Sequence, residues 1–276
     1  MPSVEGSQAR IHYEQVGEGP DIVWVSGGGG SAADWDGYQV PYFRGKFRNT
    51  TFDNRGIGAT TCDLPLPWTI EDFARDTAEL IEAVCEPPVA LVGLSLGGGI
   101  VQQVALDYPD LLRVVIPMGT AARTTGWGAD YMRAEIEWRR AGYRFGTDPV
   151  SAMMAVAHYA AMLYPARVLG DPELWPRLRE EMLAWLETDE NEDSLIPQWE
   201  ACFYDQTDRL PDCTVPMHVM VFNEDVQAPP QEGEEVAALV PGAELHLFEG
   251  MGHCSIYGHT HEVLNAELER IIRRYL

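Results

Sequence analysis

The strongest constraint on the fold is a pair of short, almost wholly apolar segments, VALVG at residues 89–93 and RVVIPM at residues 113–118. Such runs are typical of strands that are buried on both faces, as in a parallel sheet with helices on either side. The residues between them, about 96–108, are expected to form a helix. This alternation of strand and helix predicts an α/β fold with a doubly wound, mostly parallel sheet.

The alternation continues on both sides of this unit. Further strands are expected at residues 11–16, 21–26, 49–53, 217–222 and 244–248, and further helices at residues 70–85 and 260–276. Thr69 and Asp72 form a capping-box pattern in front of the helix at 70–85.

The middle of the chain has a different character. Residues 120–210 show helical segments without a convincing strand, and they hold five of the eight tryptophans and five of the ten methionines. We therefore expect a sheet-containing core made of residues 1–119 and 211–276, with residues 120–210 inserted as helices that lie over the sheet.

Composition excludes several classes of partner. Lys and Arg number 19 and Asp and Glu number 43 in 276 residues, which gives a net charge of −24. A surface this acidic repels phosphate backbones and anionic lipids, so we expect no nucleic-acid partner and no membrane partner. No apolar run approaches the roughly 20 residues that span a bilayer, and no secretory signal is visible. The five cysteines, an odd number without close pairing, indicate reduced thiols and a cytoplasmic location.

The most informative local motif is Gly93-Leu-Ser95-Leu-Gly97. It follows an expected buried strand and opens an expected helix, which is the context that a nucleophile elbow requires. The tight turn strains the serine backbone and exposes its Oγ. The helix N-terminus offers free N–H groups to a developing oxyanion. Ser95 is therefore the candidate nucleophile.

A serine nucleophile needs a base, and the base needs an acid that orients it. Asp225 follows the expected strand at 217–222, and His253 follows the expected strand at 244–248. In a parallel sheet the carboxyl ends of the strands share one edge, so these loops and that of Ser95 converge there. Glu224 is a competing acid beside Asp225.

These motifs, in this order, resemble the α/β-hydrolase fold superfamily in its cap-bearing serine-hydrolase branch. Besides the elbow and the Asp225 and His253 loops, Ser26 to Ser31 followed by Asp34-Trp35 resembles the oxyanion loop of that family. Asp53-Asn-Arg-Gly-Ile-Gly58 resembles its D-x-R-G-x-G turn. The resemblance covers nearly the whole chain. It implies an α/β-hydrolase fold with a helical cap after the sixth strand.

The resemblance also implies roles. Ser95 would be the nucleophile, His253 the general base and then acid, and Asp225 the orienting acid, with the backbone N–H groups of Gly28 and Leu96 as the oxyanion hole. The sequence departs from the family pattern twice. Ser26 stands where the oxyanion loop usually has His, and Phe222 stands where the acid turn usually begins with Gly.

Other polar residues have simpler interpretations. Asp53 and Arg55 are expected to brace the turn beside the site, and His158 to lie in the core of the helical insertion. His12, His218 and His246 lie on expected strands and are interpreted as structural. The pair His259 and His261 lacks the neighbouring ligands of a metal site. Cys254 is interpreted as a buried small residue.

The expected activity is that of a serine hydrolase without cofactor or metal. Its substrate would be a small carboxylic ester or lactone with a sizeable apolar part. The glycine run at 27–30 lacks the context of a dinucleotide or phosphate loop. Alternatives are C–C bond hydrolysis of vinylogous diketones, cofactor-free perhydrolysis and a non-hydrolytic tailoring reaction. A ligand-binding receptor or pseudoenzyme is the alternative from another class. The oligomeric state stays open, a homodimer included.

The helical insertion is the expected specificity element, because large apolar side chains of adaptable shape suit a lid over a pocket. We expect an apolar pocket between this insertion and the sheet. The candidate lining residues are Trp127, Trp138, Met153, Met154 and Tyr159.

Overall fold

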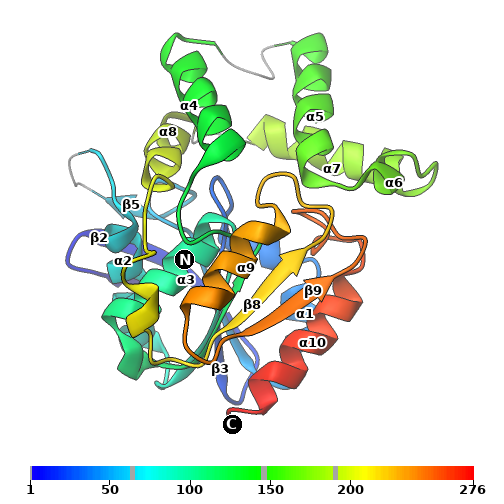
Figure 1. Cartoon of the computed structure of the whole chain (residues 1–276). Coiled ribbons are helices and arrows are strands. Elements are labelled where there is room, and N and C mark those ends of the chain that lie inside the picture. The colour runs from blue at the N-terminus through cyan, green and yellow to red at the C-terminus, as the bar shows by residue number, and fades with distance from the viewer. Residues whose placement is uncertain (1, 63–65, 144–147, 189–191) are drawn as a thin grey trace.

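A nine-stranded sheet forms the centre of the molecule (Figure 1). The structure is a computed structural model that describes residues 2–62, 66–143, 148–188 and 192–276. In chain order the strands are β1 (Ser3–Glu5), β2 (Ala9–Val16), β3 (Asp21–Val25), β4 (Arg48–Phe52), β5 (Thr61–Cys62), β6 (Val89–Leu94), β7 (Leu112–Met118), β8 (His218–Phe222) and β9 (Glu244–Phe248).

The strand order is β1-β2-β4-β3-β6-β7-β8-β9, with the short β5 paired to β2. Strands β4, β3, β6, β7, β8 and β9 run parallel to one another, whereas β2 is antiparallel to its neighbours β1, β4 and β5. This confirms the predicted fold class. The chain turns in opposite directions from β3, since β4 lies on one side of it and β6 on the other, and such a crossover point is where open α/β sheets place their ligand sites.

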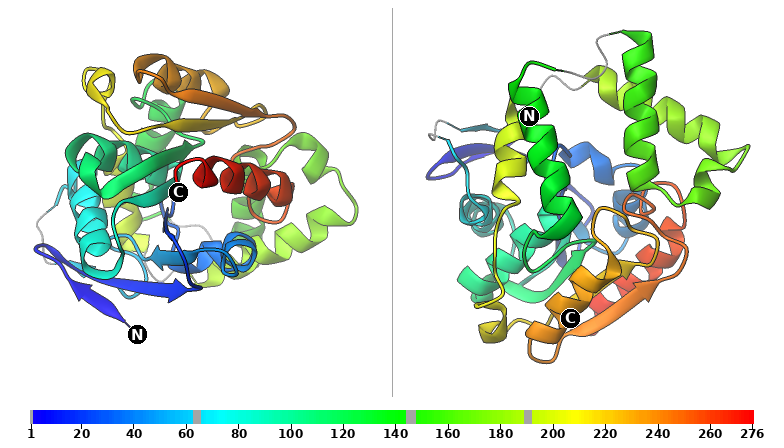
Figure 2. Two further views of the ribbon diagram at one scale, coloured as in Figure 1. Left: turned by 90° about the horizontal axis from the view of Figure 1, so that it is seen from below. Right: turned by 45° about the horizontal axis from the view of Figure 1, so that its top comes forward.

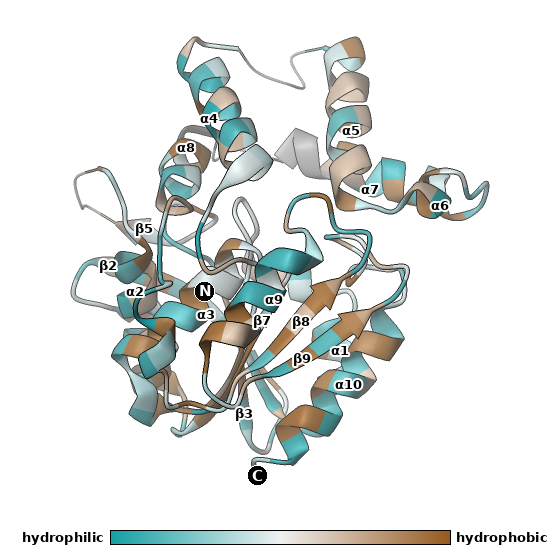
Figure 3. Cartoon of the chain, viewed as in Figure 1, coloured by the Kyte–Doolittle hydropathy of each residue, from teal (hydrophilic) through white to brown (hydrophobic). Residues whose placement is uncertain are grey.

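Helices cover both faces of the sheet, as seen from below in Figure 2. Helices α2 (Ile70–Val84), α3 (Leu96–Asp107) and α9 (Pro230–Leu239) lie on one face, and α1 (Gln39–Phe43) and α10 (His261–Arg273) lie on the other. Alternate strand residues feed the two apolar cores: Val23 packs on one side and Trp24 on the other. All residues of β3 and β6 are therefore buried. Strands β7 and β8 are mostly hydrophobic, which Figure 3 shows as brown.

In the described part of the chain between β7 and β8, five α-helices lie above the carboxyl edge of the sheet (Figure 1). We call them the cap: α4 (Gly126–Arg140), α5 (Pro149–Leu163), α6 (Ala166–Leu169), α7 (Leu174–Thr188) and α8 (Glu192–Ala201). Helix α5 packs with α6 and α7 around an apolar cluster of their own, whereas α4 pairs with α8. Asp148 caps α5 by accepting hydrogen bonds from Val150 N at 2.8 Å and Ser151 N at 3.1 Å.

Two expectations about elements need correction. The helical insertion follows the seventh strand in chain order rather than the sixth, because the short strands β1 and β5 add to the five that the sequence predicts before it. Helices α1 and α9 were not expected either.

The capping box before α2 is present, with Asp72 Oδ2 accepting from Thr69 N at 3.0 Å. No helix in the described part of the chain is long and apolar enough to cross a membrane.

Candidate active site

Ser95 occupies the turn between β6 and α3, with a backbone φ of 57° and ψ of −121°. This left-handed conformation is costly for a residue with a side chain and persists only where the surroundings enforce it. The two glycines of the motif supply that enforcement. A Cβ at Gly93 would lie 2.2 Å from Gly97 O, and one at Gly97 would lie 2.2 Å from Val25 O. No larger residue fits at either position.

His253 and Asp225 form a buried pair at the carboxyl ends of β9 and β8. His253 Nδ1 lies 2.7 Å from Asp225 Oδ2, and the two side chains are 4% and 0% exposed. Because a carboxylate only accepts, Nδ1 carries the proton, and Nε2 is left with a lone pair. Asp225 Oδ1 accepts from the backbone N of Gln227 and of Ala228, both at 2.9 Å, which fixes the carboxylate in place.

Glu224, the competing acid, faces elsewhere. Its side chain is 38% exposed and lies 3.9 Å from Arg167 Nε. The structure therefore brings Asp225, and not Glu224, to His253.

Ser95 and His253 line the same cavity. Gly119, the residue after β7, packs between the loops: a Cβ there would lie 3.2 Å from Asp225 Oδ2 and 3.4 Å from His253 Nδ1, and its φ is +49°. Sequence reasoning missed this glycine. Its position just after a buried strand was the signal that could have identified it.

Gly28 and Leu96 line the cavity beside Ser95. Within the part of the chain that the structure describes, their backbone N–H groups have no hydrogen-bond partner. Gly27 holds the loop close, since a Cβ at Gly27 would lie 3.2 Å from Ser95 Cβ. These two donors are thus available to an oxygen atom near Ser95 Oγ.

Ser26 holds the shape of the loop at residues 26–31, the candidate oxyanion loop. Its Oγ accepts from Trp35 Nε1 at 2.8 Å and donates to Ser31 O at 2.8 Å. Its carbonyl oxygen accepts from Asn54 Nδ2 at 3.0 Å. The fully buried hydroxyl therefore joins the two ends of the loop to a neighbouring tryptophan.

The turn at 53–58 braces this loop, as expected for Asp53 and Arg55. Asp53 Oδ1 accepts from Ala32 N at 3.0 Å, and Asp53 Oδ2 lies 3.0 Å from His12 Nδ1. Arg55 forms a buried ion pair with Asp76 at 2.8 Å. None of these side chains lines the cavity.

Gln198 of α8 ties the cap to both loops, a role that the sequence does not reveal. Its Oε1 accepts from Gly29 N at 2.8 Å, and its Nε2 donates to Arg55 O at 2.9 Å. The side chain is fully buried. A shift of α8 would therefore move the loop that contains Gly29.

The cavity has a volume of about 580 Å³ and extends from Ser95 up between the cap helices. This volume lies within the range of small-molecule sites. Most of its wall is apolar or aromatic, and the predicted residues Trp127 and Tyr159 belong to it. Trp199 of α8 also lines the cavity. Its ring packs against Gly28, because a Cβ at Gly28 would lie 3.5 Å from the Trp199 ring.

The pocket prediction is wrong at three positions. Met153 and Met154 are 65% and 61% exposed and lie outside the cavity wall, as does Trp138. The reason for the methionines is helix phase, because α5 turns Ala155, Val156 and Tyr159 inward and the two methionines outward. Trp138 stacks on Tyr143 instead, with ring centroids 5.9 Å apart.

A polar cluster forms part of the cavity wall between α4 and α5. Tyr159 Oη donates to Glu135 and accepts from Arg139 Nη2, the latter at 3.1 Å. Arg139 also lies over the ring of Trp199, 4.8 Å from its centroid. His158, which we expected in the core, is exposed instead, with Nε2 3.1 Å from Tyr131 Oη.

Two carboxyl groups in the cavity wall have raised pKa values and are therefore weaker acids than usual. Burial raises the pKa of Asp34 to about 7, and the nearby charge of Asp53 adds to the effect. Burial also raises the pKa of Glu232 to about 7, with a further contribution from Asp225. Burial likewise raises the pKa of the Cys254 thiol, which keeps it protonated.

The Glu232 carboxyl makes the stability of the fold depend on pH. Its pKa rises from 4.5 unfolded to about 7 folded, so the folded chain binds more protons between these values and loses stability as pH rises through them. We expect Glu232→Gln to raise the free energy of unfolding more at pH 8 than at pH 5.5, by on the order of 1 kcal/mol. Denaturant titrations at both pH values measure this. The exposed Glu234→Gln on the same helix should show no such difference, and equal changes in both variants would contradict the assignment.

Comparison with known proteins places this chain in a family. A model described as the alpha/beta hydrolase family matches residues 22–266. A Mycobacterium tuberculosis H37Rv protein, provisionally named the non-heme bromoperoxidase BpoC, is 28% identical over 94% of this chain and 97% of its own. A crystal structure of BpoC superposes with a TM-score of 0.88 over 96% of each chain, at 25% identity.

Two further relatives differ in the activity that they are named for. A Stutzerimonas stutzeri (strain A1501) protein, provisionally named the carbamate hydrolase RutD, is 27% identical over 89% of this chain and 90% of its own. The enol-lactonase of Burkholderia xenovorans LB400 shares the fold, with a TM-score of 0.84 at 21% identity over 99% of this chain and 100% of its own. Because the family model spans most of the chain, this protein belongs to the alpha/beta hydrolase family.

Proposed function

We propose that this protein is a serine hydrolase that cleaves a carboxylic ester or lactone with a sizeable apolar part, through an acyl-enzyme on Ser95. The observation that carries the proposal is the His253–Asp225 pair, joined at 2.7 Å, in the same cavity wall as the strained Ser95. A nucleophile that lines the cavity, a base with a lone pair and a fixed acid are the three parts of this chemistry.

In the first half of the reaction, Ser95 Oγ attacks the carbonyl carbon while His253 Nε2 takes the hydroxyl proton. The carbonyl oxygen becomes an oxyanion that accepts hydrogen bonds from Gly28 N and Leu96 N. Asp225 stabilises the imidazolium that forms. The tetrahedral intermediate then collapses: the carbon–oxygen bond of the ester breaks, and His253 returns the proton to the leaving alkoxide.

In the second half, water attacks the acyl carbon and His253 takes one of its protons. The same two N–H groups stabilise the second oxyanion. Collapse releases the carboxylic acid, and His253 gives the proton back to Ser95 Oγ. With a lactone the alcohol and the acid belong to one product molecule, because the carbon chain of the opened ring still links them.

The cavity supports an apolar substrate of moderate size. Its wall is mostly apolar, and about 580 Å³ leaves room for a ring or a medium acyl chain beyond the reacting carbonyl. The polar cluster of Glu135, Arg139 and Tyr159 adds hydrogen-bonding groups at the cap side of the wall. A substrate with an apolar body and a polar group remote from the carbonyl would match both features.

Perhydrolysis is the second candidate, and the similarity to BpoC over 94% of this chain favours it. In that reaction hydrogen peroxide replaces water in the attack on the acyl-enzyme, so a peracid leaves in place of the acid. The peracid can then oxidise bromide, giving a carboxylate and hypobromous acid. Bromination of an acceptor in the presence of a carboxylic acid, peroxide and bromide tests this candidate directly.

One prediction from this proposal concerns the nucleophile. Ser95→Ala should remove turnover by about 10⁴-fold or more without affecting folding, because no other group can form the acyl intermediate. The measurement is turnover on a panel of esters, lactones, a vinylogous diketone and the peroxide assay. A fluorophosphonate should label the wild type once, at residue 95. Full activity of the alanine variant, or no activity of the wild type on any panel member, would contradict the proposal.

The acid supplies a matched pair of variants. Asp225→Asn should lower kcat by up to about 10⁴-fold, because the amide donates to the imidazole and favours the wrong tautomer. Glu224→Gln, one residue away, removes a charge that faces Arg167 and should change kcat little. Steady-state rates of the two variants decide the assignment, and equal losses would mean that Asp225 does not orient His253.

Helix α4 offers a similar test of the pocket. Trp127 lines the cavity, whereas Trp138 on the same helix does not. Trp127→Ala should lower kcat/KM for bulky acyl esters by about 10-fold relative to an acetate ester, because apolar contact to the larger group is lost. Trp138→Ala should leave this ratio unchanged. A ratio that responds to Trp138→Ala as strongly as to Trp127→Ala would place the substrate elsewhere.

A further inference from the structure

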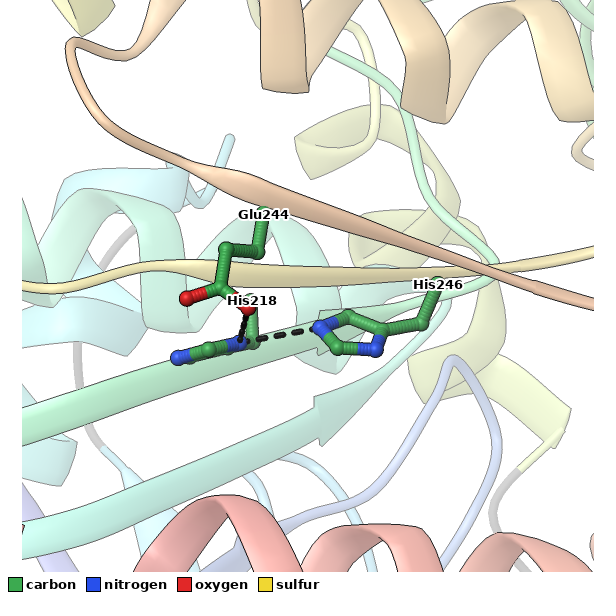
Figure 4. A group of neighbouring side chains, drawn as sticks. All are labelled: His218, Glu244 and His246. Atoms are coloured by element: carbon green, nitrogen blue, oxygen red, sulfur yellow. Dashed lines mark hydrogen bonds and ion pairs between the residues drawn. The ribbon is translucent and has the colours of Figure 1, made fainter. Parts of the chain in front are cut away.

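A second group of chemically competent side chains lies on strands β8 and β9, at the amino-terminal end of β8, away from the cavity. His218 pairs in register with Glu244, and Met220 pairs with His246. Residues two apart in a strand share a face, so His218, Glu244 and His246 all point to the side that α10 covers. Figure 4 shows the three side chains turned toward one another.

The donor atoms of this group converge. His218 Nδ1 lies 2.9 Å from His246 Nε2 and 3.8 Å from Glu244 Oε2, and all three donor atoms lie within 4.8 Å of one another. Two imidazole nitrogens bound to one Zn²⁺ ion at tetrahedral geometry are separated by about 3.3 Å. The rings therefore need to part by only about 0.4 Å to admit such an ion.

Each donor is held from behind by a second residue. His246 Nδ1 lies 2.9 Å from Glu267 Oε1, and His218 Nε2 lies 2.8 Å from Tyr275 Oη. Glu244 accepts from Arg274 at 2.6 and 3.0 Å. Outer hydrogen bonds of this kind orient metal ligands. Because His246 Nδ1 donates to Glu267, His246 Nε2 carries the lone pair, and the proton between the two rings lies on His218 Nδ1. That proton must move to His218 Nε2, where Tyr275 Oη can accept it, before an ion binds.

A cation can reach the cluster from the surface. His246 and Glu267 line a surface groove beside α10, and Glu244 is 45% exposed, which leaves an entry path. A carboxylate has several lone pairs, so Glu244 can accept from Arg274 and still bind an ion.

We propose that His218, Glu244 and His246 bind a divalent transition-metal ion of borderline softness, with Zn²⁺ as the reference case and water in the remaining position. Two imidazoles and one carboxylate form the donor set that such ions prefer, whereas Mg²⁺ and Ca²⁺ prefer oxygen alone. The rival interpretation is a plain hydrogen-bonded chain from Tyr275 through both rings to Glu267. That chain satisfies the rings, and Arg274 holds Glu244. The two interpretations therefore differ in whether an ion can replace the proton between the two rings.

The test is titration of the full chain, stripped of metal with a chelator, with Zn²⁺ alone in a calorimeter. We expect one ion per chain and a rise in Tm, since an ion that binds only the folded state stabilises it. His246→Gln should weaken binding at least about 10-fold, and Glu267→Gln, which removes only an outer partner, by about 10–100-fold. His158→Gln, at an exposed histidine of the cap, is the matched control and should bind as the wild type does.

Three results would overturn the proposal: a wild type that binds no Zn²⁺ at 100-fold molar excess, binding that is equal in all variants, or equally strong binding of Mg²⁺. The first of these would leave the hydrogen-bonded chain as the correct interpretation. If His246→Gln does not fold, Glu244→Gln replaces it, because that side chain is half-exposed. Hydrolysis should persist in every one of these variants, since none of the residues lines the cavity, so the outcome is independent of the proposed reaction.

Discussion

The close approach of two backbones at the elbow is the constraint on which the site depends. Gly97 lies so near the end of β3 that a Cβ would stand 2.2 Å from Val25 O, and Gly93 is equally close to Gly97 O. This contact sets the left-handed conformation of Ser95, brings the N-terminus of α3 under the reacting atoms and places Gly27 against Ser95 Cβ. The proposed nucleophile and oxyanion donors are therefore positioned by backbone packing rather than by flexible side chains.

The loops around this contact are held by buried polar side chains. Ser26 joins the ends of the oxyanion loop, Asp53 anchors its far side through Ala32, and Gln198 bonds it to the cap. Each of these groups is buried and hydrogen-bonded, so the loss of one partner would leave another unsatisfied at a cost of about 1–3 kcal/mol. Trp35 Nε1 donates to Ser26 Oγ at 2.8 Å and completes the hydrogen bonding of this buried hydroxyl.

The sequence predicted every strand except the short β1 and β5, the helices α2, α3 and α10, and the residues that meet at the sheet edge. These depend on local patterns: wholly apolar strands, a capping box and glycines around Ser95. The sequence did not predict which face of a helix is buried where tertiary packing alone decides it. Helix α5 is apolar nearly all round, so no periodicity separated Met153 and Met154, which are exposed, from Val156 and Tyr159, which are buried. Gln198 gave no signal for a comparable reason, since its partners Gly29 and Arg55 lie more than 140 residues away.

The two ends of β8 carry different chemistry, and the sheet connects them. Asp225 follows the carboxyl end of the strand, and His218 begins its amino end. The loop that holds His253 runs from β9 to α10, and these are the elements that supply His246 and Glu267. The contact between His246 and Glu267, at 2.9 Å, therefore joins the two elements at either end of the loop that holds His253. Strand β9 is an edge strand with β8 as its one neighbour among the described strands, so this contact adds a side-chain link on the side that α10 covers.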